Sequence, residues 1–139
     1  MNRLHSHMRE LCLAAFKTAE THNNNVSIVA VDLGGHPVVL LRCDHAPFSA
    51  TEAARRKAVA SASLQMPTSG MAEMFAGDPM VVTALHASGD MLIVPGGFPI
   101  IFENRCIGGL GIAGGHYSED DLIGRKALAS TAASTDRPS

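Results

Sequence analysis

The sequence contains no tryptophan, and aromatic residues make up only 4% of its 139 residues. Because 46% of the residues are nevertheless hydrophobic, the core must be built from Val, Ile, Leu, Met and Ala. Small side chains bury little apolar area each, so helices made from them often complete their burial against another subunit. We therefore expect a homo-oligomer.

The features of nucleic-acid-binding and membrane proteins are also missing. The formal net charge is -2, and the basic residues are scattered apart from the short run at 55–57. The longest apolar runs, at 26–31 and 38–41, are too short to span a bilayer, and the N-terminus leads into an amphipathic pattern rather than a signal peptide. The sequence therefore predicts a cytoplasmic protein with neither a nucleic-acid nor a membrane partner.

Three further kinds of site are not expected from the sequence. The three cysteines are widely spaced with no CxxC, which favours free thiols over disulfides or a thiolate metal site. None of the seven histidines forms HExxH, so a zinc enzyme is not expected. The glycines at 109, 111 and 114 have the spacing of a GxGxxG dinucleotide loop, but the segment is expected to be a strand inside a meander rather than a strand-to-helix turn, so no nucleotide is expected.

Hydrophobic periodicity and turn residues predict a single domain over residues 1–130, with a flexible tail at 131–139. The predicted helices cover about 4–19, 49–65, 68–75, 79–86 and 118–130, and the predicted strands 26–31, 38–42, 91–94, 98–103 and 106–113. A Ser49–Glu52 capping box would open the second helix, and a Glu52–Arg56 pair would stabilise it. Strands joined by tight turns favour a three-layer α/β/α sandwich around a five-stranded antiparallel sheet.

Glycine-rich turns are the most informative local feature. Glycine weakens a strand, so its repeated use indicates close approach of a helix, another backbone or a ligand. Candidate cofactor-binding residues are Gly96, Gly97, Gly114, Gly115 and Ser118, since the last three precede or open a helix whose N-terminus could hold an anion. Tight turns and close packing explain the same glycines without a ligand.

A few polar residues are candidates for chemistry. Lys57 falls within a stripe of small residues, where a buried carboxylate or a ligand should accompany it; Asp32 and Glu103 are the expected partners. With Lys57, the proposed catalytic groups are His45 and His116, which lie on predicted turns. The candidate iron ligands are His36, His45 and His86. Five methionines, at positions 66, 71, 74, 80 and 91, would either line an apolar pocket or fill gaps in the core.

Several ordered motifs together resemble those of a known family. They are the runs 28–38 and 42–44, Ala54, Lys57-Ala58, Pro67-Thr68, Pro95 to Ile100 and Ile107 to Gly115. In this order they are similar to the GlcG/HbpS family of haem-binding proteins, which includes the C-terminal domain of PduO-type adenosyltransferases. The resemblance implies a profilin-like α/β/α fold, a tetramer or octamer and haem as a ligand.

Two main functions remain open at this point. The first is an oligomeric accessory protein that binds a small ligand, with haem as the candidate cofactor and a histidine as its iron ligand. The second is an enzyme or sensor for a hydroxy- or keto-acid in a catabolic pathway, with the acid at 114–118 beside Lys57 and a proton moved by His45 or His116. A non-catalytic scaffold is the third and weakest alternative.

Overall fold

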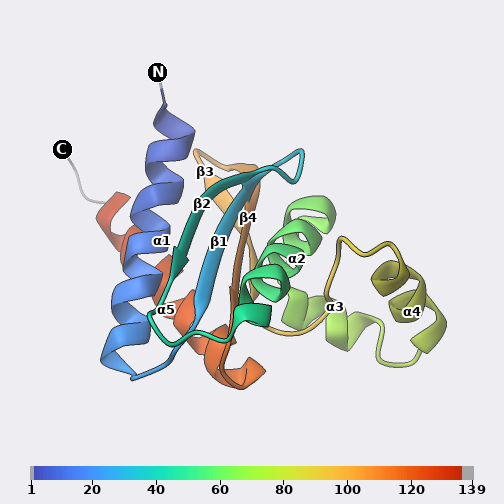
Figure 1. Cartoon of the computed structure of the whole chain (residues 1–139). Helices are drawn as coiled ribbons and strands as arrows, with labels where there is room; N and C mark the ends of the chain where they lie inside the picture. Colours follow the sequence, from blue (N-terminus) through green and yellow to red (C-terminus); the bar gives the residue numbers. More distant parts are fainter. Residues whose placement is uncertain (1, 136–139) are drawn as a thin grey trace.

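The computed structural model describes residues 2–135, which form helices and strands that alternate in groups (Figure 1). The helices are α1 (Arg3–Thr21), α2 (Phe48–Leu64), α3 (Thr68–Met74), α4 (Pro79–Ala87) and α5 (Tyr117–Thr135). The strands are β1 (Ser27–Asp32), β2 (Pro37–Arg42), β3 (Gly97–Phe102) and β4 (Arg105–Ala113). The order of elements along the chain agrees with the prediction except for one strand.

The sheet has four antiparallel strands in the order β2-β1-β4-β3. The predicted five-stranded sheet is wrong because the segment 91–94 pairs with no strand. Its backbone N–H groups are used elsewhere: Leu92 donates to the carbonyl of Arg56, and Ile93 donates to Nε2 of His86. A β-branched and apolar run thus becomes a loop that follows α2 and α4.

The layers are the predicted three. Helices α1 and α5 cover one face of the sheet and α2 covers the other, while α3 and α4 stand away from the sheet beyond α2 (Figure 1). Side chains of β1 alternate between the two cores, since Ile28 and Ala30 face α1 and α5 while Val29 and Val31 face α2. The periodicity of two therefore places each strand between two apolar layers.

Glycines in β4 allow α2 to lie very close to the sheet. A Cβ atom at Gly109 would collide with the carbonyl of Ala58, and one at Gly111 would collide with the carbonyl of Ala54. The alanine stripe of α2 provides the other half of this contact, because Ala54 and Ala58 are fully buried. Close packing, one of the two explanations considered for the glycines, accounts for this pair.

Helix ends differ from the predictions in detail. Helix α2 begins at Phe48 without a side-chain cap, so the expected Ser49–Glu52 box is absent. Glu52 accepts a hydrogen bond from Arg55 at 2.6 Å instead of pairing with Arg56, whose guanidinium donates to the carbonyl of Met91 at 2.8 Å. The partly buried hydrogen bond from Arg56 to Met91 thus takes the place of the expected Glu52–Arg56 pair.

The C-terminal helix is longer than expected. It begins at Tyr117 and continues to Thr135, so residues 131–135 of the predicted tail are helical, while 136–139 lie outside the described residues. Within the described part of the chain, no helix has both the length and the apolar character needed to cross a membrane.

The methionines are divided between core and surface. Met71 is buried with Ala60 and Ile93 in a small core beyond α2, whereas Met74 and Met80 are exposed. The five methionines therefore do not gather around one ligand pocket.

Candidate functional site

A pocket of about 410 Å³ lies where the start of α2, the end of β4 and the start of α5 meet. Its walls are mostly apolar and small, and its polar groups converge at one end. The lining residues are Pro47, Ser49, Ala50, Ala53, Lys57, Leu92, Val94, Ala113, Gly114, Gly115, His116, Tyr117 and Asp120. An apolar cleft with a few convergent polar groups is the usual form of a small-molecule site.

The pocket contains a buried ion pair. Lys57 is 3% exposed and Asp120 is 2% exposed, and 3.0 Å separate Nζ of Lys57 from Oδ2 of Asp120. The ammonium also donates to the carbonyl of Ile112 at 2.8 Å. The prediction of a buried carboxylate partner is thus confirmed.

The two carboxylates named for that role are occupied elsewhere. Asp32 accepts the N–H groups of Gly34 and His36 in the β1–β2 turn, and Glu103 pairs with Arg3. Their expected pairing with Lys57 is wrong because both lie at the opposite end of the sheet from Asp120, which the fold of α5 carries back to Lys57.

Burial moves the titration of both partners toward their neutral forms. Loss of hydration lowers the pKa of Lys57, although the charge of Asp120 opposes this shift. Burial likewise raises the pKa of Asp120, against the attraction of Lys57 and the hydrogen bond from the Gly115 N–H. Burial therefore favours the neutral amine of Lys57 more than exposure to water would, although Asp120 favours the ammonium.

The predicted glycines gather around this pair. A Cβ atom at Gly96 would lie 2.8 Å from Nζ of Lys57, and one at Gly97 would lie 2.6 Å from its carbonyl oxygen. Gly114 and Gly115 line the pocket, and the Gly115 N–H donates to Oδ1 of Asp120 at 3.2 Å. Of the four glycines, Gly114 and Gly115 line this pocket, whereas Gly96 and Gly97 pack against Lys57.

The two histidines predicted to be catalytic, His45 and His116, lie in different pockets. His116 lines the pocket, and its Nδ1 lies 2.7 Å from Oγ of Ser118, which fixes the ring at the start of α5. His45 instead lines a separate hollow with Cys43 and Asp44, after β2. The structure thus brings Lys57 and His116 together and leaves His45 out.

The three candidate iron ligands also lie apart. His36 and His45 are at opposite ends of β2, and Nε2 of His86 accepts a hydrogen bond from the Ile93 N–H at 2.8 Å. Nδ1 of His36 lies 3.3 Å from Asp32. Among residues 2–135, no group of three His, Cys, Asp or Glu side chains is arranged to hold a metal ion.

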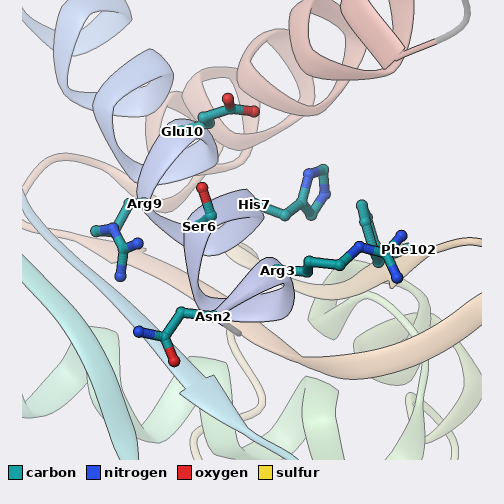
Figure 2. A pocket seen from close by; sticks show the side chains of 7 residues that line it. All are labelled: Asn2, Arg3, Ser6, His7, Arg9, Glu10 and Phe102. Atoms are coloured by element: carbon teal, nitrogen blue, oxygen red, sulfur yellow. The ribbon is translucent and has the colours of Figure 1, made fainter.

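A second hollow, of about 450 Å³, contains a histidine that the sequence analysis did not select (Figure 2). His7 is 8% exposed, its Nδ1 is buried without a hydrogen-bond partner, and its ring centroid lies 4.9 Å from that of Phe102. Burial lowers the pKa of His7 despite the nearby charge of Glu10. The sequence signal was its position one turn before Leu11, within the buried stripe of α1.

Cationic side chains flank His7. The guanidinium of Arg3 lies 5.5 Å from the centroid of the Phe102 ring, and Arg9 lines the same hollow. Figure 2 shows Arg3 and His7 on the Phe102 side of α1 and Arg9 on the other side. A neutral imidazole, an aromatic face and two cations are therefore grouped around the start of one helix.

Comparison with known proteins places these features in context. The model of a family described as "Haem degrading protein HbpS-like" matches residues 5–129. A double mutant of Streptomyces reticuli HbpS has a similar structure, with 30% identity, coverage of 91% of this chain and 84% of that one, and a TM-score of 0.80. The structure of a PduOC:haem complex is 26% identical over 90% of this chain and 91% of that one, with a TM-score of 0.81.

A curated relative is much longer than this chain. The corrinoid adenosyltransferase PduO of Citrobacter freundii is 28% identical over 123 residues, which cover 88% of this chain and 37% of PduO. The match thus spans little more than a third of that protein, and the rest of PduO lies outside it.

Proposed function

The chain belongs to the family described as haem degrading protein HbpS-like, and from this premise we propose that it binds haem. The observation that carries the proposal is the His7 hollow, where a buried imidazole nitrogen has no hydrogen-bond partner. Bound haem supplies a redox-active iron whose reactivity depends on its axial ligand and surroundings. What the chain must supply is a ligand, an apolar contact and partners for the propionates.

His7 fits the ligand role electronically. Because burial lowers its pKa, the imidazole stays neutral at neutral pH, and only a neutral imidazole has a lone pair for iron. Phe102 beside it offers an apolar ring for contact with a macrocycle.

The arginines suit the propionates. Arg9 has no ion-pair partner among the described residues, and Arg3 has one, Glu103, in a pair that is exposed on both sides. Exposed pairs contribute only about 0–1 kcal/mol, so Arg3 can exchange Glu103 for a propionate at little cost. Two anionic groups therefore have two cations within the same hollow.

The histidines selected from the sequence fit less well. Ligation through Nε2 of His86 would break its bond with the Ile93 N–H. The His45 hollow is lined by the acidic groups of Glu20 and Asp44, which would repel propionates. His36 is exposed and lies beside Asp32, with no apolar ring at the turn.

The oligomeric, cytoplasmic accessory role belongs to the same proposal. Exposed residues surround His7 and Phe102 in this hollow, so a second subunit could cover the face of the macrocycle that one chain leaves open. A tetramer or octamer, as the resemblance implies, would supply such a neighbour.

The hydroxy- or keto-acid function is the less favoured alternative. An anionic acid would gain most from a free cation, but the charge of Lys57 is already met by Asp120 at 3.0 Å. The first turn of α5 adds further negative charge from Glu119, which opposes an acid at the Gly114-Gly115 turn.

The test is a haemin titration followed by the Soret band, with light scattering to give the mass of the complex. Wild-type protein should saturate, and His7→Ala should lose or shift the band. His5→Ala is the matched control, because His5 is exposed on the same turn of α1. Saturation with an unchanged band in His7→Ala would overturn the assignment of His7, and the absence of saturation in the wild type would overturn haem binding.

A further inference from the structure

We propose that the Lys57 pocket binds a small neutral carbonyl compound, an aldehyde or a ketone, and holds it as a reversible imine on Nζ of Lys57. This site is separate from the His7 hollow and does not depend on haem. The two sites share no lining residue.

The charge balance of the pocket decides the ligand class. Lys57 and Asp120 cancel each other, so the buried end of the pocket carries no net charge. A carboxylate entering it would have to displace Asp120, which Gly115 also holds through a backbone hydrogen bond. A neutral carbonyl compound brings no charge into the pocket, so it does not compete with Asp120 for Lys57 and has no comparable desolvation penalty.

The shape of the pocket favours a compound of a few carbon atoms. Ala50, Ala53 and Ala113 provide small apolar walls, and Leu92 and Val94 close the side formed by the loop after α4. Lys57 lines this space from α2, and Gly96 leaves room for its ammonium because a Cβ atom there would lie only 2.8 Å from Nζ. An apolar body with one polar end therefore matches the lining.

The reaction balances without any oxidant or cofactor. After its proton passes to Asp120, the neutral amine attacks the carbonyl carbon, and a C–N bond forms to give a carbinolamine. Loss of the former carbonyl oxygen breaks the C–O bond and leaves a C=N bond, and the released water carries both hydrogens of the amine. The imine is reversible because water can re-enter and restore Lys57.

The surrounding groups support this step. Asp120 lies 3.0 Å from Nζ and can accept and return the proton, and burial moves both partners toward their neutral forms. His116 lies on the same pocket wall, and its contact with Ser118 orients the ring. The sequence analysis assigned Lys57 and His116 to a hydroxy- or keto-acid function, and the Lys57–Asp120 pair shifts the preferred substrate from an acid to a neutral carbonyl compound.

The chain provides its own internal controls for a trapping experiment. It has three lysines, of which Lys17 and Lys126 are exposed. Full-length protein incubated with propanal and cyanoborohydride should gain one propyl group at Lys57 before either exposed lysine, as located by peptide mass spectrometry. Modification confined to the N-terminal amine, Lys17 and Lys126 would overturn the proposal.

A second variant separates pocket binding from chance reactivity. Ala53→Met narrows the pocket while leaving the Lys57–Asp120 pair in place, and it should reduce trapping at Lys57 at least tenfold without changing trapping at Lys17. Circular dichroism checks that the variant is folded. Equal trapping at Lys57 in Ala53→Met and wild type would show that the pocket does not select the aldehyde, and the proposal would fail.

Discussion

Two buried ionisable side chains, Lys57 and His7, lie in different parts of this molecule and differ in their hydrogen-bond partners. Lys57 has a carboxylate and a carbonyl as partners, whereas Nδ1 of His7 has none. A buried polar atom without a partner costs free energy, and among the described residues Nε of Arg56, Oγ of Ser61 and Oδ1 of Asp121 share this property with Nδ1 of His7. The Lys57 pair connects α2 to α5, while the free nitrogen of His7 is the group that the proposed function assigns to a ligand.

The largest effect is expected from breaking the satisfied site. Asp120→Ala leaves the Lys57 ammonium buried without its carboxylate and should lower the free energy of unfolding by about 3–5 kcal/mol. Urea unfolding followed by circular dichroism measures this loss. Glu103→Ala, which breaks an exposed pair, is the control and should change stability by less than about 1 kcal/mol.

Removing both charges should restore most of that loss. In the double variant Lys57→Met, Asp120→Leu, no buried charge remains, and replacement of a buried ion pair by apolar groups is often neutral or stabilising. We expect its unfolding free energy to lie within about 2 kcal/mol of wild type, well above that of Asp120→Ala. A double variant as unstable as the single one would show that shape, rather than charge pairing, decides the cost.

The unsatisfied site should respond in the opposite direction. His7→Leu removes the unpaired nitrogen and keeps an apolar contact with Phe102, so it should raise the free energy of unfolding by about 1 kcal/mol. The same substitution at the exposed His116 is the matched control and should bring no gain. A loss of stability in His7→Leu would mean that the imidazole contributes to the fold after all.

The smallest effect concerns pH. Since burial lowers the pKa of His7 below 6.5, the unfolded chain binds a proton in acid before the folded chain does. This stabilising contribution is therefore complete above pH 6.5 and is lost as the pH falls through 6.5 toward the folded pKa. The stability of wild type should fall more steeply than that of His7→Leu across this window, and parallel curves in the urea measurement would contradict the argument.

Much of this architecture follows from local pattern. The apolar stripe of α1, the β1–β2 hairpin and the glycines of β4 are visible in the sequence because each depends on spacing along one segment. The prediction of a strand at 91–94 is wrong because its backbone N–H groups donate to Arg56 and His86. Only the tertiary structure brings these two residues close to the segment.

The site shows the same division. The glycines were identified because their repeated use indicates a close approach of another group, and Lys57 because a cation among small residues of a packed helix needs a partner. Asp120 was missed since it lies 63 positions from Lys57, and nothing in the sequence distinguishes it from Asp32 or Glu103. His7 was missed because the histidines were considered as metal-binding pairs, whereas its distinctive property is burial without a partner.

The most direct test of the central claim is the change in thermal unfolding midpoint that haemin causes in wild type and in His7→Leu. A ligand that binds only the folded state raises the midpoint, because it stabilises that state by RT ln(1 + [L]/Kd). We predict a rise in wild type and none in His7→Leu, even though the variant is the more stable of the two without haemin. An equal rise in both proteins would show that haem binds without His7 and would contradict the account.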